Sequence, residues 1–218
     1  MTAADAIRPA VAFDGRTRRR QRNAERLYDA ANELLAARSY DELSVDEICA
    51  RANVGRATFF RIFETKAGLL REFNRRLAND AAHRIEEAGD VDVHTALGHI
   101  RDAIIDAWRR AGLGHVGMAR EFLRSAPSAE PHAAHPELLA LVVERISTAV
   151  DTGELPETVP VALAASLALT HMTAPIAYAI AGHDVDIDAL SRVLLDQWYA
   201  GMTAPVRRRV RRVVGRGR

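Results

Sequence analysis

The segment 44–63 constrains the fold more than any other part of the sequence. Ser44 followed by Glu47 matches a capping box, in which the serine hydroxyl accepts a backbone N–H and the glutamate carboxylate accepts the N–H of the serine. This pair predicts the start of a short helix after Leu43, with Val45, Ile48 and Cys49 facing inward. The sequence of 52–55, Ala-Asn-Val-Gly, predicts a tight turn, because asparagine tolerates a left-handed backbone.

A second short helix is predicted over about 56–62, with Phe59 and Phe63 as inward anchors. A longer helix, about 18–38, precedes the pair and has an apolar face. Two short helices joined by a tight turn and braced by a longer helix have helix-turn-helix geometry, in which the second short helix enters the major groove of DNA. Geometry alone leaves two interpretations open, a DNA-binding unit and a plain scaffold.

The rest of the chain also has helical periodicity, and no segment alternates with period two for long enough to predict a sheet. Alanine and leucine supply much of the apolar content, which favours helix. The predicted fold class is therefore all-α, an N-terminal three-helix helix-turn-helix domain followed by a C-terminal helical bundle. Further helices are expected at about 65–88, 93–111, 117–123, 136–151, 161–181 and 186–200, and a loop is expected at 125–135.

The charges are unevenly distributed along a chain whose net charge is only +1. Residues 1–66 hold 12 basic and 10 acidic side chains, residues 67–206 hold 11 and 19, and residues 207–218 hold 7 and none. Six arginines crowd the segment 16–26, where Arg18 and Arg19 are candidates to bind a polyanion. The arginine-rich end is expected to be a disordered tail that adds nonspecific DNA affinity or serves only solubility.

These patterns divide the chain into four predicted parts. Residues 1–15 are expected to form a flexible arm, 16–66 the helix-turn-helix domain, 67–204 a ligand-binding and dimerisation domain, and 205–218 the basic tail. The stretch 158–183 lacks charged side chains and is long enough to span a membrane. Its prolines, threonines and histidine favour a helix buried in protein, so no membrane partner is expected and the cytoplasm is the predicted location.

The N-terminal part closely resembles the DNA-binding domain of the TetR family over residues 18–70. The matching text is Ala30-Ala31-Asn32-Glu33-Leu34-Leu35, Tyr40, Ser44-Val45-Asp46-Glu47-Ile48, Ala52-Asn53-Val54-Gly55-Arg56-Ala57-Thr58-Phe59-Phe60-Arg61-Ile62-Phe63, Lys66 and Leu69-Leu70. The resemblance implies a transcriptional regulator that binds a palindromic operator as a homodimer and responds to a small molecule. Repression that a ligand relieves is the expected mode of action.

The resemblance also implies roles for the matched positions. Ser44 and Lys66 would contact phosphate, while Arg56, Ala57 and Thr58 would face the groove, where an arginine can bind guanine bidentately. The full set of expected DNA contacts is Arg18, Arg19, Ser44, Gly55, Arg56, Ala57, Thr58, Phe60 and Lys66. Three positions depart from the family pattern: Gly55 replaces a common serine, Phe60 a common tyrosine, and Ile62 a common histidine or tyrosine. These departures put phosphate contacts at Phe60 and Ile62 in doubt and keep open a scaffold protein that has lost operator recognition.

In the C-terminal bundle the resemblance implies a ligand cavity and a dimer interface built by the last two helices. Candidates for the cavity lining, suited to an apolar or aromatic ligand, are Trp108, Met118, Phe122, His171, Met172 and Tyr178. Candidates for the dimer interface are Leu167, Leu190, Leu194 and Trp198. Plain core packing is the alternative for each of these side chains.

No catalytic, metal or cofactor site is expected from the sequence. Phosphate-binding, dinucleotide-binding and serine-hydrolase motifs are absent, and Cys49 is interpreted as a core residue. His132 and His135 lie in a loop without enough neighbouring ligands for zinc. Asp184, Asp186 and Asp188 imitate the start of a calcium loop, but the positions that need Gly and Glu hold Ala189 and Leu195. These aspartates are expected to cap and charge a helix start.

Overall fold

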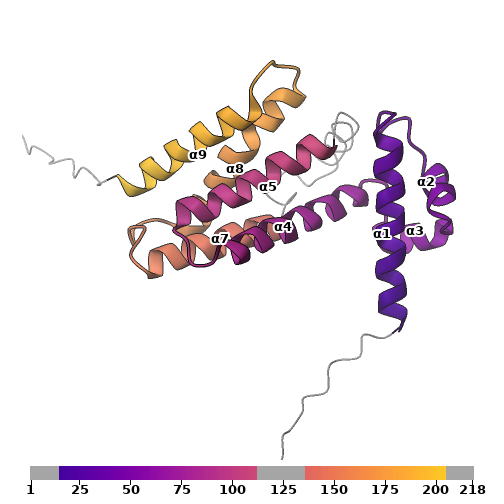
Figure 1. Cartoon of the computed structure of the whole chain (residues 1–218), viewed down its shortest axis with the longest axis horizontal. Coiled ribbons are helices and arrows are strands. Elements are labelled where there is room, and N and C mark those ends of the chain that lie inside the picture. Colours follow the sequence, from indigo (N-terminus) through magenta and orange to yellow (C-terminus); the bar gives the residue numbers. More distant parts are fainter. Residues whose placement is uncertain (1–14, 112–135, 205–218) are drawn as a thin grey trace, which may run out of the picture. The chain divides into compact units, whose positions relative to one another are not determined.

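The computed structural model describes residues 15–111 and 136–204. All regular elements in these ranges are helices (Figure 1), as the sequence predicts. Their bounds are α1 Gly15–Leu35, α2 Val45–Ala52, α3 Arg56–Phe63, α4 Gly68–Ala88, α5 Val93–Ala111, α7 Pro136–Asp151, α8 Val161–Ile180 and α9 Ile187–Thr203. The helix and loop expected at 117–123 and 125–135, the N-terminal arm and the basic tail lie outside the described residues.

The described residues fall into two compact units. Those of Met1–Asn79 and Asp106–Glu137 form unit 1, and those of Asp80–Ile105 and Leu138–Arg218 form unit 2. The helices α4 and α5 each contribute residues to both units. The division also runs through α7, whose first two residues, Pro136 and Glu137, belong to unit 1. The domain boundary that the sequence places near residue 66 stays a prediction.

Unit 1 is built around the inward faces of α1, α2 and α3. Leu27, Ile48 and Phe59 are fully buried, and the Phe59 ring lies 5.3 Å from that of Phe63. Burying such side chains supplies the main stabilisation of a small domain, about 1.5–3 kcal/mol for each large residue. This apolar centre fixes α3 against α1 and leaves the opposite side of α3 exposed.

The connection from α3 to α4 is tight because of Gly68. A Cβ at this position would overlap the backbone carbonyl of Phe63. The Gly68 N–H donates to the carbonyl of Thr65 at 3.0 Å. Glycine thus allows α4 to begin directly against the end of α3.

Unit 2 has its most extensive helix contact between α8 and α9. Small side chains on α8, including Ala164, Ala165 and Ala168, are buried and allow close approach. The indole of Trp198 on α9 is also buried and donates to the carbonyl of Ala164 at 3.1 Å. One indole thereby fills the space beside the small residues and satisfies its own N–H.

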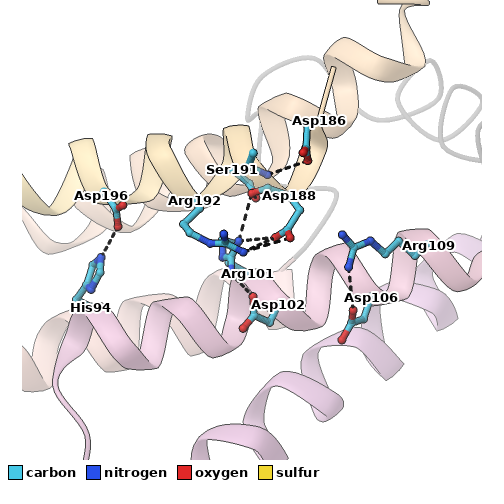
Figure 2. A network of polar contacts seen from close by, with 11 residues as sticks. His94, Arg101, Asp102, Asp106, Arg109, Asp186, Asp188, Ser191, Arg192 and Asp196 are labelled. Carbon is cyan, nitrogen blue, oxygen red and sulfur yellow. Dashed lines mark hydrogen bonds and ion pairs between the residues drawn. The ribbon is translucent and has the colours of Figure 1, made fainter. Parts of the chain in front are cut away.

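A polar network ties α5 to the first turn of α9 within unit 2 (Figure 2). The buried guanidinium of Arg101 donates to the carboxylate of Asp188 at 2.8 Å and to Asp102. Asp188 also pairs with Arg192 at 3.1 Å. Asp186 caps α9 by accepting the N–H of Ala189 at 3.0 Å, which confirms the predicted capping role.

One helix in the described ranges, α8, is long and apolar enough to cross a membrane by length and composition. This is weak evidence, because core helices of soluble proteins pass the same test. Ala165, Leu169 and Met172 of α8 are fully buried within unit 2. Packing of this kind is what the sequence predicts for the uncharged stretch.

Candidate nucleic-acid interface

The N-terminus of α2 is fixed by the reciprocal cap that the sequence predicts. The Glu47 N–H donates to the Ser44 hydroxyl at 3.2 Å, and the Ser44 N–H donates to the Glu47 carboxylate at 2.9 Å. The Ser44 N–H and hydroxyl, followed by Arg38 at 2.6 Å, lower the pKa of Glu47 to about 2. The cap leaves Ser44 exposed at a helix N-terminus, where the helix dipole favours an anion such as phosphate.

The turn between α2 and α3 depends on Asn53. Its backbone is left-handed, with φ 49° and ψ 52°, as the sequence predicts. The Asn53 N–H donates to the carbonyl of Ala50, and the Val54 N–H to that of Cys49. Arg26 of α1 reaches the Asn53 carbonyl at 3.4 Å. The turn thereby holds α3 at a set position beside α2.

The N-terminal half of α3 exposes both polar and apolar side chains to solvent. Gly55, Arg56 and Ala57 are exposed, Thr58 is half-buried, and Phe60 keeps 39% of its surface exposed. Gly55 occupies the cap position of α3 and, lacking a hydroxyl, makes no side-chain cap bond. We call Gly55, Arg56, Ala57, Phe60 and the exposed Arg61 the α3 surface.

Arg56 is held by contacts on both sides. Its Nη1 donates to both carboxylate oxygens of Asp46, at 2.6 and 2.7 Å. Its guanidinium carbon lies 5.6 Å from the centre of the Phe60 ring. The Phe60 ring itself stands edge-on to Phe59, with centroids 5.4 Å apart. The buried Phe59 thus supports Phe60, and Phe60 borders Arg56.

Lys66, the only lysine of the chain, lies near the start of α2. Its Nζ donates to the carbonyls of Tyr40 and Leu43, at 2.8 and 2.9 Å. It also lies 4.1 Å from the centre of the Tyr40 ring. Lys66 therefore closes the loop between α1 and α2 and places a positive charge beside Ser44.

A row of arginines extends from the start of α1. Arg18, Arg19, Arg20 and Arg22 are all exposed, and the segment that carries them is helical from Gly15. A helix advances each successive residue by about 1.5 Å along its axis and turns it by about 100°, so these cations are spread around the start of α1. Such a row suits a polyanionic backbone and carries no base specificity of its own.

Comparisons with known proteins agree with this geometry. Residues 27–73 match the model described as bacterial regulatory proteins, tetR family. The segment that carries α2 and α3 is therefore similar to the DNA-binding domain of the TetR family. It is 30% identical over 82 residues to an uncharacterised HTH-type transcriptional regulator, YvkB, of Bacillus subtilis, and the match covers 38% of this chain and 43% of that protein. The chain thus spans less than half the length of this curated relative.

Solved structures extend the similarity to most of the fold. FadR from Bacillus subtilis, solved in complex with stearoyl-CoA, has a TM-score of 0.59 and 19% identity, over 81% of this chain and 98% of that chain. GusR of Salmonella enterica has a TM-score of 0.58 and 19% identity, over 83% and 95%. The TetR-like fold therefore includes the C-terminal helices. The model that residues 27–73 match describes regulatory proteins, and the relative YvkB is named a transcriptional regulator.

The predicted ligand-binding residues that the structure describes lie in both units. Trp108 belongs to unit 1, where its ring packs edge-on to Phe73 with centroids 5.7 Å apart. On α8, Met172 is fully buried, and the His171 ring nitrogen Nδ1 bonds the Leu167 carbonyl at 2.7 Å. Tyr178 is 49% exposed and stacks on His183. Met118 and Phe122 lie outside the described residues.

The predicted dimer residues differ in exposure. Leu167 is 37% exposed, Leu190 and Leu194 are half-buried, and Trp198 is buried against α8 in the same subunit. Trp198 therefore joins α8 to α9 and offers little surface to a second chain. Two further side chains on these helices are exposed and are not among the predicted residues, Leu163 at 56% and Val193 at 50%. Leu167 and Tyr178 are exposed on α8 as well.

Two residues of unit 1 have roles that sequence reasoning missed. Asp46 is the partner of Arg56, and a signal existed in their opposite charges on either side of a tight turn. Gly68 sets the start of α4, and its position directly before a buried pair of leucines was the available signal. Cys49 is buried and its pKa is raised by burial, as expected of a core thiol. In the described ranges no group of three metal-binding side chains comes together.

Proposed function

We propose that this chain is a cytoplasmic regulator of the TetR family, which binds DNA sequence-specifically and acts as a homodimer on a palindromic operator. It acts as a repressor that a small apolar or aromatic ligand releases from the operator. The observation that carries the proposal is the α3 surface, because Arg56, Ala57 and Phe60 stand exposed on α3, which follows the capped helix α2 and the turn at Asn53. Exposed residues of this kind at the start of a second short helix suit the major groove.

Phosphate contacts are supported at three places on unit 1. Ser44 lies at the N-terminus of α2, Lys66 carries its charge beside it, and Arg18 and Arg19 are exposed on α1. Contacts of this class supply affinity and register, while contacts with base edges supply specificity. Unit 1 therefore has groups for both tasks.

A dimer is supported by the exposed apolar side chains of α8 and α9. Four of the five large exposed hydrophobic residues in the described ranges, Leu163, Leu167, Tyr178 and Val193, belong to these two helices. Such concentration of apolar surface is typical of a protein interface. A twofold dimer would present two α3 helices to half-sites about 34–36 Å apart.

A small-molecule effector is supported by a solved relative and by the side chains of α8. FadR, which has the same fold, was solved with stearoyl-CoA. His171 uses Nδ1 on its own helix, which leaves Nε2 as a polar group among the largely apolar side chains of α8. A ligand that favoured a dimer with a different spacing between its α3 helices would release the operator by population shift.

The experiment that tests DNA recognition is selection from a random duplex library at roughly physiological salt, where nonspecific contacts are screened. We expect a palindrome with half-sites one helical turn apart. The variant Arg56→Ala should lose the enrichment, and the matched control Arg51→Ala, which removes an arginine of α2 that pairs with Glu33, should keep it. A folded, dimeric wild-type protein that enriches no sequence contradicts the proposal and favours the scaffold alternative.

The dimer is tested separately by sedimentation equilibrium. Val193→Glu places a charge on the exposed apolar surface of α9 and should shift the protein toward monomer. Ala140→Glu adds the same charge at an exposed position of α7 and should not. An unchanged dimer in Val193→Glu would contradict an interface at this position.

A further inference from the structure

The ion pair between Asp46 and Arg56 lies on the surface that we propose to face DNA. Asp46 belongs to the first turn of α2, and Arg56 is the first residue of α3. The two side chains are 65% and 60% exposed, and both carboxylate oxygens lie within 2.7 Å of Nη1. Exposed pairs contribute little to stability, a median of about 0–1 kcal/mol. This pair, at the expected point of base contact, therefore adds little to stability but restricts where the guanidinium lies.

The pair leaves one edge of the guanidinium open. Within the described residues, the hydrogen bonds of Arg56 all use Nη1, so Nε and Nη2 keep their N–H groups. Arginine has five N–H donors in a planar fork, and two parallel donors are enough to bind O6 and N7 of guanine. Phe60 borders the guanidinium on a further side, with its ring centre 5.6 Å away. The contacts thus restrict the side chain while leaving a guanine-binding edge.

The charge of Asp46 also changes which DNA groups Arg56 prefers. A carboxylate beside the guanidinium offsets its positive charge and repels a phosphate, whereas the guanine edge is uncharged. Arg61 provides a contrast on the same helix, because it is exposed and forms no ion pair with any described residue. The α3 surface therefore carries one restrained arginine and one unrestrained arginine.

We propose that Asp46 is a specificity-determining positioning residue, which holds Arg56 in an orientation that binds guanine and discourages its contact with phosphate. This inference rests on the proposed function, and it adds a residue of α2 to the recognition of the base. Asp46 acts through Arg56 and need not touch DNA. The operator half-site then contains a guanine opposite Arg56.

The test compares Asp46→Asn with the matched control Glu33→Gln, since each removes one negative charge and one arginine partner. Library selection and titration of the selected duplex and an unrelated duplex are carried out on the full chain. In Asp46→Asn we expect the preference for guanine at one position of each half-site to fall about tenfold, the size of one good bidentate contact. Affinity for the unrelated duplex should rise, with a salt slope steeper by about one ion for each freed arginine. Glu33→Gln should keep the wild-type guanine preference.

A second comparison separates positioning from a structural effect. In an Arg56→Ala background, where no motif is expected, the readout is affinity for the unrelated duplex. Asp46→Asn should cause no rise in that affinity there, because the residue acts through Arg56. Thermal unfolding followed by circular dichroism verifies that each variant is folded. A wild-type motif with a guanine preference that Asp46→Asn leaves unchanged would overturn the role of Asp46 alone. Absence of any motif for the wild-type protein would overturn both this role and the proposed function.

Discussion

Two pairs of adjacent helices, α2 with α3 in unit 1 and α8 with α9 in unit 2, are held by different kinds of contact. The first pair uses specific polar and backbone features: a reciprocal cap at Ser44, a left-handed Asn53 and the hydrogen bonds from Lys66 to two carbonyls. The second pair uses small buried alanines and a single indole. Each of these features in the first pair requires a particular residue type. The packing of the second pair, by contrast, can be made by many small apolar residues.

This difference bears on what each pair can do. A surface that binds DNA bases must be positioned closely, and the devices around α3 supply that rigidity. A pair of helices packed through small apolar side chains can slide or repack with fewer hydrogen bonds to break. We therefore expect substitutions in unit 1 to act on recognition and those in α8 and α9 to act on assembly.

The largest expected effect comes from removing one buried side chain in each region. Phe59→Ala should cost about 3–5 kcal/mol and Met172→Ala about 2–5 kcal/mol, because both side chains are fully buried. Amide hydrogen–deuterium exchange, measured at peptide resolution, should become faster in α2 and α3 for Phe59→Ala. It should become faster in α8 and α9 for Met172→Ala. If either variant lost protection equally in both helix pairs, the two pairs would unfold together. The proposed difference between them would then be wrong.

A smaller loss of stability is expected when Lys66 is replaced. Comparing it with an exposed arginine of unit 1 tests whether the hydrogen bonds of Lys66 matter. Lys66→Met keeps the aliphatic stem and removes the donor to two carbonyls, so it should cost about 2–3 kcal/mol as measured by urea unfolding. Arg61→Met removes an exposed cation from the same unit and should stay within about 0.5 kcal/mol of the wild type. Similar losses of unfolding free energy in the two variants would mean that Lys66 contributes only through its charge and not through its two hydrogen bonds.

The helices could be predicted from the sequence because their signals are local. The Ser44 and Glu47 pair is separated by three residues, and Asn53 specifies its own backbone conformation, so both were found and confirmed. Helical periodicity located α8 and α9, since burial on one face needs no knowledge of the partner. The family resemblance then supplied the expected roles of Ser44 and Arg56.

The remaining features depend on contacts between distant positions. The carbonyl partners of Lys66 lie 26 and 23 residues away, and Trp198 meets Ala164 across 34 residues. Periodicity shows that Trp198 faces a neighbour but not whether that neighbour is α8 or a second chain. The pairing of Asp46 with Arg56 likewise follows only from the angle that the turn imposes.

Two helix caps allow a direct comparison at a smaller scale. Ser44→Ala and Asp186→Ala each remove a side-chain acceptor from a helix N-terminus and should each cost about 1 kcal/mol. Ser44 is also a donor to Glu47, at 2.7 Å from its hydroxyl, so its loss should cost more than the loss of Asp186. Urea unfolding measures the cost, and operator binding should weaken only in Ser44→Ala. Weaker binding in Asp186→Ala would show that the cap in unit 2 influences recognition as well.

The smallest effect is a pH dependence confined to the cap of α2. The Ser44 N–H and hydroxyl lower the pKa of Glu47 to about 2 from an ordinary value of 4.5, so the folded state favours the carboxylate. The resulting stabilisation is present above about pH 4.5 and is lost as the pH falls from 4.5 toward 2. Glu47→Gln keeps an oxygen that can accept the Ser44 N–H, but its side chain does not titrate. As the pH falls from 4.5 toward 2, the midpoint of urea unfolding should therefore fall less in this variant than in the wild type. Parallel pH profiles for the two proteins would mean that the reciprocal cap contributes through its hydrogen bonds and not through the charge of Glu47.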